Sequence, residues 1–265
     1  MKLGIIGCGK MGTAFVAGAI RSGVVAASAV TGIDPVKAAR EHFAGVTGAK
    51  AAEEISALAD CDVILLCTKP QDACAALELL VSVSKSPPLA ISIAAGVKLS
   101  ALEQAAKGKA RVVRAMPNTP AAVGKGASGF CMGHLATSAD ADVAKQILSS
   151  VGLAIEVPER LMDAVTGLSG SGPAYVYLVI DALADGGVKA GLPRADAIRL
   201  AAQTVWGAAA MVLETGEHPA VLKDMVTSPG GTTIAGLAEL EKHGLRSALI
   251  EAVAAATRRS AELGK

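Results

Sequence analysis

Short, almost uninterrupted apolar runs alternate with amphipathic segments over about the first 158 residues. Such runs predict strands buried on both faces, and the periodic segments between them predict helices. The expected strands are Lys2–Gly7, Ala29–Ile33, Asp62–Cys67, Leu89–Ile93, Ala110–Met116, Gly126–Met132 and Ala154–Val157. The expected helices are Lys10–Ser22, Val36–Phe43, Ala51–Leu58, Gln71–Val83, Ser100–Ala106 and Ala139–Ser150. This alternation predicts an α/β domain with a parallel sheet covered by helices on both faces.

From Pro158 onward the strand signals vanish and Ala/Leu/Val-rich helical patterns take over. The expected helices are Met162–Leu168, Ala174–Ala190, Arg194–Thr215, Ala220–Val226, Thr232–Lys242 and Leu245–Leu263. We therefore expect two domains, residues 1–158 and an all-α domain of residues 159–265, with a ligand bound between them.

Composition excludes several classes of protein. The 265 residues carry 25 Lys and Arg against 24 Asp and Glu, which argues against a nucleic-acid or membrane-surface protein. The 52% hydrophobic content excludes disorder, and no apolar run reaches the length of a membrane helix. Five cysteines, an odd number without a C-x-x-C pair, predict a reducing, cytoplasmic compartment. Only 2% of the residues are aromatic, so the core must be built from small side chains.

A glycine motif lies between the first expected strand and helix. Gly7-Cys8-Gly9-Lys10-Met11-Gly12 fits the G-x-G-x-x-G pattern in the required strand–turn–helix context. Gly7 permits a tight turn, Gly9 lets the backbone approach a pyrophosphate, and Gly12 lets the helix pack on the strand. The alternative is a purely structural turn. We favour a dinucleotide site, because the helix N-terminus also offers N–H groups to phosphates.

Asp34 ends the second expected strand, 22 residues after Gly12. A carboxylate at about this distance binds the ribose hydroxyls of a dinucleotide. It would also repel a 2′-phosphate, so the cofactor choice leans toward NADH. Arg40 is the nearest arginine, and Lys37 lies close enough along the chain to leave NADPH open.

Three further strand ends carry distinctive loops, where ligands of doubly wound sheets bind. Lys69, in Thr68-Lys69-Pro70-Gln71, could neutralise a phosphate or be an ordinary solvated lysine. Ala94-Ala95-Gly96 would allow a flat ring to lie close to the backbone. Asn118, in Met116-Pro117-Asn118-Thr119-Pro120, is a ligand contact or part of a proline-punctuated turn.

The helical half has a motif of its own, Ser228-Pro229-Gly230-Gly231-Thr232-Thr233. Successive N–H groups from Gly230 to Thr233 would form an anion nest at a helix N-terminus, suited to a small carboxylate. The alternative is a simple helix cap. A cap needs neither two glycines nor so many hydroxyls, so we favour the site. A second glycine-rich turn, Gly167–Ala174, predicts either a ligand wall or a close helix contact.

Several kinds of catalytic chemistry are absent from the pattern. The four histidines are scattered without metal-ligand spacing, so no metal site is expected. No serine elbow and no P-loop occur. A reductase without an obvious acid–base group implies a substrate that is already reactive.

Taken together, these motifs resemble the pyrroline-5-carboxylate reductase family over nearly the whole chain. The segments that carry the resemblance are GCGKMG, TKPQ, Ala94–Val97, MPNTP, LSGSGPAYVY, Asp181–Arg194 and Pro219–Glu241. The resemblance implies a Rossmann domain followed by a helical domain that interlocks with a second subunit, giving an obligate homodimer or a higher homo-oligomer. It implies reduction of 1-pyrroline-5-carboxylate to L-proline with NADPH or NADH, the last step of proline biosynthesis.

The resemblance also assigns roles to residues. Gly7 to Gly12, Asp34, Thr68, Lys69, Ala95 and Asn118 would contact the cofactor. Ser228, Gly230, Gly231, Thr232 and Thr233 would hold the substrate carboxylate. Thr233 is the candidate catalytic residue, which would hydrogen-bond the ring nitrogen or relay its proton. Asp34 departs from members with a small hydroxyl residue at this position, which puts a preference for NADPH in doubt.

Two rival functions remain to be compared. A 3-hydroxyacid dehydrogenase would need a lysine base, for which Lys189 is the best candidate. A nucleotide sensor would bind NAD(H) without turnover, but it needs no second small-anion site. The small side chains of residues 159–265 favour close packing across two subunits, so we expect this half of a single chain to form no stable monomer.

Overall fold

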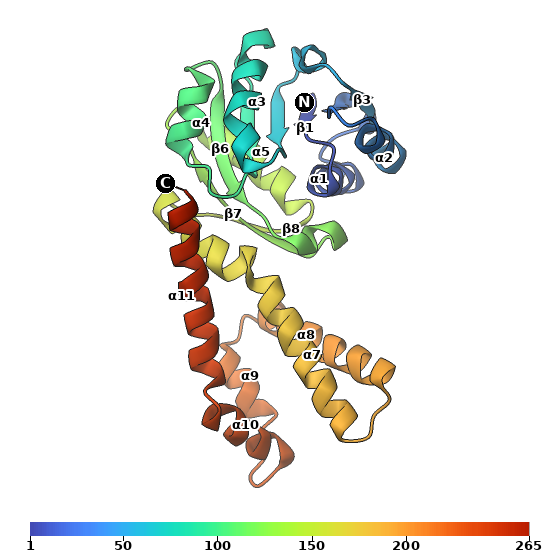
Figure 1. Ribbon diagram of the computed structural model, residues 1–265, viewed down its shortest axis with the longest axis vertical. Helices are drawn as coiled ribbons and strands as arrows, with labels where there is room; N and C mark the ends of the chain where they lie inside the picture. The colour runs from blue at the N-terminus through green and yellow to red at the C-terminus, as the bar shows by residue number, and fades with distance from the viewer. Residues whose placement is uncertain (265) are drawn as a thin grey trace. The chain divides into compact units, whose positions relative to one another are not determined.

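The computed structural model describes residues 1–264, which divide into two units (Figure 1). The sheet unit is Met1–Ser171 together with the end of the last helix from Ala254 onward, and the helical unit is Gly172–Val253. The expected two-domain boundary near Pro158 therefore lies before the point at which the contacts divide the chain.

One eight-stranded sheet forms the centre of the sheet unit, in the order β3-β2-β1-β4-β5-β6-β7-β8. All pairs from β3 to β6 are parallel, β7 runs antiparallel to β6, and β8 is parallel to β7. The first six positions have the strand order of a doubly wound dinucleotide-binding sheet. The α/β class is confirmed, and the sheet is parallel as expected except where β7 pairs with β6. The strands are β1 (Leu3–Ile6), β2 (Val30–Ile33), β3 (Lys50–Ala52), β4 (Val63–Leu66), β5 (Leu89–Ser92), β6 (Arg111–Met116), β7 (Gly126–Met132) and β8 (Gly152–Glu156).

The helices of the sheet unit cover both faces of the sheet. They are α1 (Lys10–Arg21), α2 (Lys37–Thr47), α3 (Pro70–Val83), α4 (Leu99–Ala106), α5 (Ser138–Ser149) and α6 (Met162–Val165). Side chains of α1, α2 and α5 pack in one core cluster, and side chains of α3 and α4 pack in the other. Alternate strand residues point into the two clusters: Ile5 and Leu65 into the first, Ile6 and Leu66 into the second.

Two predicted helices are wrong in part. The segment expected to be a helix at Ala51–Leu58 instead completes β3, which pairs with the edge of β2, and then forms a 3₁₀ turn at Ile55–Leu58. The expected helix Met162–Leu168 ends as an α-helix at Val165 and continues as a π-helical turn, Thr166–Gly170.

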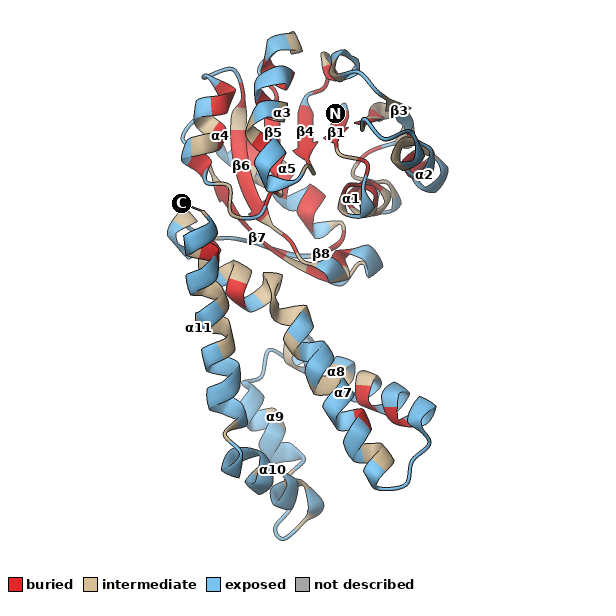
Figure 2. Ribbon diagram, viewed as in Figure 1, coloured by how far each residue is buried: buried red, intermediate tan, exposed pale blue. Residues whose placement is uncertain are grey.

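The helical unit contains little core of its own. It consists of α7 (Gly172–Lys189), α8 (Arg194–Thr215), α9 (Pro219–Met225), α10 (Thr232–Lys242) and the first part of α11 (Leu245–Leu263), up to Val253. Among its residues only Ala184, Ala197 and Ala201 form a buried apolar cluster, where α7 meets α8. The rest of its surface is largely exposed (Figure 2). These small side chains let the two helices approach closely but bury little area.

The N-terminus of α5 allows a test of stability. Asp140 forms a capping box with Thr137. Both of its carboxylate oxygens also accept the Arg111 Nε–H, each at 3.0 Å. Burial raises the pKa of Asp140, but the hydrogen bonds from Thr137 and Arg111 outweigh it and lower the pKa overall. The stabilisation is therefore present above the unfolded-state pKa of about 3.9 and is lost as pH falls through the lowered folded value.

We expect Asp140→Ala to lower the free energy of unfolding at pH 7 by about 1–2 kcal/mol, because the capping box loses its reciprocal bond to the Thr137 N–H and Arg111 loses its carboxylate partner. The variant should also show a shallower loss of stability below about pH 4. Urea unfolding across this pH range measures both effects. Asp142→Ala, an exposed position on the same helix, is the matched control. Equal effects of the two substitutions would contradict this role of Asp140.

Candidate active site

The turn between β1 and α1 brings backbone groups unusually close together. Gly7 has φ +104°, and a β-carbon there would lie 2.6 Å from the carbonyl oxygen of Cys67. A β-carbon at Gly12 would collide with the carbonyl oxygen of Gly7. Gly9 differs, because nothing lies within 4 Å of the place where its β-carbon would stand. Two glycines are thus required by the fold, whereas Gly9 faces open space that a ligand can occupy.

The Asp34 carboxylate connects this turn to the turn after β2. Its Oδ2 accepts the Cys8 N–H at 2.9 Å, and its Oδ1 accepts the Val36 N–H at 2.9 Å. Each oxygen keeps a further lone pair, so the carboxylate can still accept ribose hydroxyls. The Cys8 side chain is buried, and burial, with the nearby Asp34 charge, raises the pKa of its thiol to about 12. Cys8 is therefore a structural thiol, and only its backbone lies near the groove.

A groove of about 540 Å³ opens at this edge of the sheet. Five of the predicted cofactor residues line it: Gly7, Gly9, Asp34, Thr68 and Lys69. The prediction did not include Pro35, Glu53 and Asp72, which also line it. Thr68 Oγ1 is buried without a hydrogen-bond partner in the described structure, so a polar group of a ligand would satisfy it. The volume of the groove, the open space at Gly9 and the unpartnered hydroxyl of Thr68 all fit a dinucleotide.

The other predicted cofactor residues do not line this groove. Lys10 and Met11 start α1, where Lys10 is exposed and Met11 packs against the core. Ala95 lines a second cavity of about 360 Å³ in the sheet unit, together with Pro70, Gly96 and, from α11, Arg259 and Ser260. The sequence did not predict that α11 lines this cavity. The helix is held there by a 2.7 Å hydrogen bond from Ser260 Oγ to Asp163 Oδ1.

Asn118 has an internal role in the structure. Its Oδ1 accepts the Ala127 N–H at 2.9 Å, and its Nδ2 donates to the Ser169 carbonyl at 3.0 Å. These bonds tie the loop after β6 to β7 and to the π-helical turn. Only one N–H of the amide is left for a ligand, so a cofactor contact by Asn118 stays a prediction.

The second predicted site lies at the N-terminus of α10 in the helical unit. Gly230 has φ +68°, and Gly231 occupies the N-cap position without any side-chain cap. Thr232 is exposed and Thr233 half-buried in the first helical turn. The Ser228 side chain makes no capping bond to the helix, so a simple cap does not explain the motif. The Gly231 N–H donates to the Ser228 carbonyl at 3.1 Å, so the first N–H groups available to an anion are those of Thr232 and Thr233.

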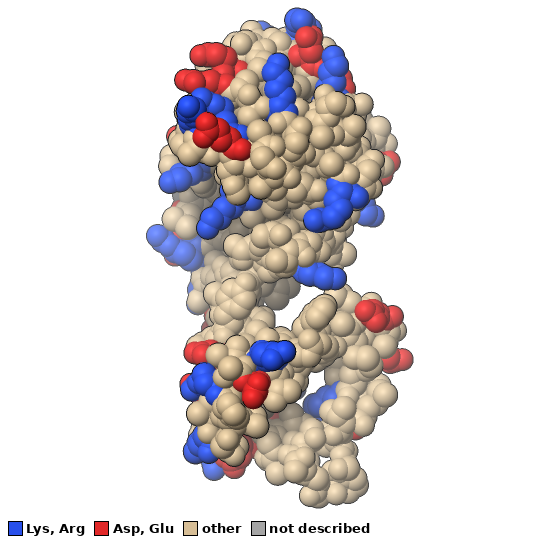
Figure 3. Space-filling model, turned by 90° about the vertical axis from the view of Figure 1, so that its right-hand side faces the viewer, with Lys and Arg blue, Asp and Glu red and all other residues tan. Residues whose placement is uncertain are grey.

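Charges elsewhere on the protein are dispersed. The face in Figure 3 shows acidic and basic residues scattered without a single-sign patch. Within residues 1–264, no group of three or more His, Cys, Asp or Glu residues is placed to hold a metal ion. No helix of the described part of the chain has the length and apolar character to cross a membrane.

The strand order, the glycine turn and the groove together define a Rossmann-type dinucleotide-binding oxidoreductase. Consistent with this class, residues 2–96 match a family model described as NADP oxidoreductase, coenzyme F420-dependent. Residues 159–263 match the model for pyrroline-5-carboxylate reductase dimerisation. The chain belongs to the pyrroline-5-carboxylate reductase family, as its full-length relatives establish.

Those relatives include the pyrroline-5-carboxylate reductase of Methanosarcina acetivorans, 48% identical over 265 residues and covering 100% of this chain and 98% of its own. The Synechocystis enzyme of the same name is 50% identical over 266 residues, covering 100% and 99%. A solved pyrroline-5-carboxylate reductase from Coxiella burnetii superposes with a TM-score of 0.94 at 34% identity over 100% and 98% of the two chains. The Plasmodium falciparum structure, with NADP bound, has a TM-score of 0.85 at 34% identity over 100% and 98%.

Gly9 offers a direct test of the groove. We expect Gly9→Ala to raise the Kd for NAD(P)H about tenfold or more, because the new methyl group occupies the space that a pyrophosphate needs. The melting temperature should stay within about 2 °C, because the added β-carbon meets nothing in the protein.

Gly45→Ala is the control for Gly9→Ala, since its β-carbon also meets nothing within 4 Å and it lies in α2 away from the groove. It should leave the Kd unchanged and raise stability by about 0.5–1 kcal/mol. Calorimetric titration and thermal unfolding give both readouts. Unchanged dinucleotide binding by Gly9→Ala would refute the assignment.

Proposed function

We propose that the protein reduces the C=N bond of 1-pyrroline-5-carboxylate to L-proline with NADPH or NADH, the last step of proline biosynthesis. The observation that carries this proposal is the uncapped N-terminus of α10, formed by Gly230 and Gly231. We assign it as a second anion site, separate from the dinucleotide groove and suited to a carboxylate. The names of the full-length relatives support the same substrate.

The substrate carboxylate binds to the backbone N–H groups of Thr232 and Thr233, since that of Gly231 donates to the Ser228 carbonyl. Hydrogen bonds to a charged group are each worth about 1.5–3 kcal/mol, and the helix dipole adds to them. The Ser228 hydroxyl is close to Gly231 and can donate a further bond. The imine ring that carries this carboxylate is thereby held in one orientation. A bound reduced nicotinamide supplies the hydride, and the protein contributes by orienting the C=N carbon toward it.

We assign to Thr233 the contact with the ring nitrogen. Its hydroxyl lies in the first turn of α10 and is half-buried, beside the N–H groups that would hold the carboxylate. A cyclic imine is protonated readily near neutral pH, so a hydroxyl that orients or relays this proton is sufficient. The chemistry then requires no strong base.

The alcohol-oxidising rival requires a lysine base with a lowered pKa, which burial or a neighbouring cation provides. Lys189, its best candidate, is the last residue of α7 and is exposed. A nucleotide sensor leaves the nest at α10 without a role. The imine reductase accounts for both sites.

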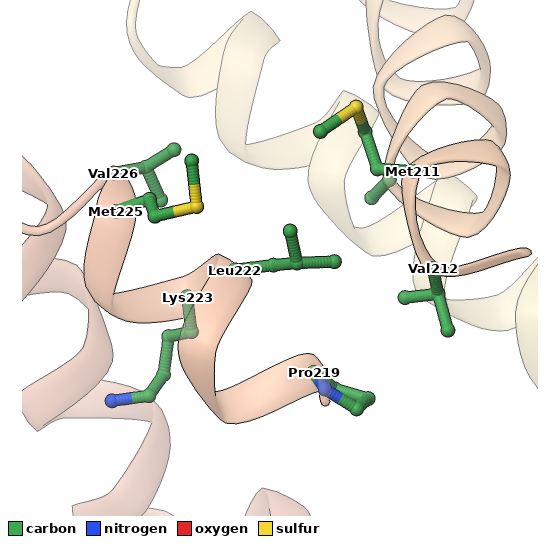
Figure 4. A pocket seen from close by; sticks show the side chains of 8 residues that line it. Met211, Val212, Pro219, Leu222, Lys223, Met225 and Val226 are labelled. Atoms are coloured by element: carbon green, nitrogen blue, oxygen red, sulfur yellow. The ribbon is translucent and has the colours of Figure 1, made fainter. Parts of the chain in front are cut away.

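We further propose an obligate homodimer formed through the helical unit, which can assemble into a higher homo-oligomer. Three alanines are too little core for five helices. Large apolar side chains remain exposed along them, Leu178 to 71% and Leu213 to 76%. An apolar pocket of about 350 Å³ lies between α8 and α9, where Met211, Leu222 and Met225 face one another (Figure 4). A second copy of the chain would bury this surface, in agreement with the dimerisation model that matches residues 159–263.

We place the protein in the cytoplasm on the basis of its cysteines. None of the five cysteines forms a disulfide, and Cys8, Cys61 and Cys131 are buried. They behave as small apolar core residues, which a reducing compartment preserves.

The reaction and the role of Thr233 can be tested together. We expect the full-length protein to oxidise NAD(P)H with 1-pyrroline-5-carboxylate, and not with a 3-keto acid or without substrate. Thr233→Ala should lower kcat about tenfold or more while the Kd for NAD(P)H changes less than about twofold, because the hydroxyl contacts the imine rather than the cofactor.

Thr204→Ala is the control, an exposed threonine of α8 whose hydroxyl bonds only its own helix. It should leave kcat and KM unchanged. Turnover with the 3-keto acid would favour the dehydrogenase, and no turnover with any substrate would favour the sensor. Full turnover by Thr233→Ala would refute the role of this hydroxyl alone.

A further inference from the structure

The carboxyl end of β2 carries a set of charges that decides which dinucleotide fits. Asp34 is held there by the N–H groups of Cys8 and Val36, each at 2.9 Å. Because both oxygens are held, the carboxylate cannot rotate away from a ligand in the groove. Its negative charge stays at the position where a dinucleotide fold receives the adenosine ribose.

Arg40 is the nearest arginine to this position, but its guanidinium is engaged within the protein. Nη1 donates to the carbonyl of Asp34 at 2.7 Å and to that of Pro35 at 3.0 Å. Nη2 donates to Glu53 Oε2 at 3.0 Å. The Arg40 side chain is only 17% exposed, so it lies beneath the turn rather than over the groove.

The remaining charges on the groove are mainly negative. Asp34, Glu53 and Asp72 line it, against one cation, Lys69. Lys37 lies at the start of α2, where it pairs with Glu41 on the helix surface. A 2′-phosphate carries a charge of about −1.5 to −2 at neutral pH. Such a group would meet two carboxylates at the β2 end, and the only arginine there is already paired with one of them.

We propose that this groove selects NADH over NADPH, and that Glu53 is the residue that determines the selection. Glu53 acts in two ways: it adds a carboxylate beside the ribose position, and it occupies the Arg40 nitrogen that a 2′-phosphate would use. In dinucleotide folds an arginine at this place accommodates the 2′-phosphate. Removing the Glu53 charge would release Arg40 for that role. The inference rests on the dinucleotide site of the proposed function and deepens it.

Glu53 is also the residue that can be changed without disturbing the fold. Its side chain is 64% exposed, and its carboxylate has a single protein partner, Arg40 Nη2. An ion pair with one partner this exposed contributes little to stability. Asp34 is unsuitable for the test, because its substitution would release two backbone N–H groups and disturb the glycine turn.

The test measures dinucleotide binding by full-length protein in the absence of the imine. Calorimetric titration gives the Kd for NADH, NADPH, 5′-ADP and 2′,5′-ADP. We expect wild type to bind NADH about tenfold more tightly than NADPH, and 5′-ADP more tightly than 2′,5′-ADP. In Glu53→Gln the Kd for NADPH and 2′,5′-ADP should fall about five- to tenfold, while that for NADH changes less than about twofold.

Two further variants separate the release of Arg40 from a general change of charge. Glu54→Gln removes the same charge from the adjacent exposed position, which does not line the groove, and it should leave every Kd unchanged. Arg40→Gln added to Glu53→Gln should abolish the gain in NADPH affinity. A circular-dichroism melt of each variant checks that the fold is retained.

Each outcome decides the inference. Tighter binding of NADPH than of NADH by wild type would overturn it, and so would equal effects of Glu53→Gln on both dinucleotides. A gain that survives the loss of Arg40 would overturn the role assigned to that residue. Because binding is measured without the imine, a failure to reduce pyrroline-5-carboxylate would refute the proposed reaction and leave the cofactor preference standing.

Discussion

The hydrogen bonds of the Asp34 carboxylate are the interaction on which the site depends. They connect the turn after β1 to the turn after β2 across the edge of the sheet. Bonds to a charged acceptor are shorter and stronger than neutral ones, so this connection is firm. It holds the glycine turn in the shape that leaves Gly9 open to a ligand, and it fixes a negative charge beside the ribose position. One side chain therefore sets both the geometry and the charge of the groove.

The small number of aromatic residues has a structural reason. All three phenylalanines lie in the core on one face of the sheet, and a β-carbon at Gly32 would stand 2.7 Å from the Phe43 ring. Elsewhere the fold relies on close backbone approach, as where Gly7 passes Cys67. In the helical unit α7 and α8 likewise approach closely, through a contact made of alanines. Such contacts are tight but bury little area, which leaves that unit dependent on a partner.

Much of the fold was predictable because its patterns are long and clearly bounded. The helices α8, α10 and α11 have the predicted bounds; Pro193 precedes α8, and Gly216, at φ +69°, ends it. The strand β3 was missed because three residues without an apolar run give no periodic signal. The direction of β7 is set by its pairing with β6, which no local pattern encodes. The bond between Ser260 and Asp163 spans 97 residues and is invisible to any local analysis.

The residues of the site also fall into two groups, those that spacing along the chain predicts and those that only the fold brings together. Gly7, Gly9 and Asp34 were predicted from spacing, because the chemistry demands those residue types at that distance. Glu53 was missed for a physical reason: it directly follows β3, and without that strand nothing placed it at the carboxyl edge of the sheet. Recognising a strand at Lys50–Ala52 would have revealed it. The hydrogen bonds of Arg40 to Asp34, Pro35 and Glu53 depend on the tertiary fold, which no local pattern encodes.

The central claim is that backbone amide groups hold both ligands, one at the glycine turn and one at the start of α10. Amide hydrogen exchange of the full-length protein, followed with NADH and separately with L-proline, tests it most directly. NADH should slow exchange at the β1–α1 turn and at Thr68–Lys69, and L-proline should slow it at Thr232 and Thr233. Protection by L-proline elsewhere, with the start of α10 unchanged, would contradict this account.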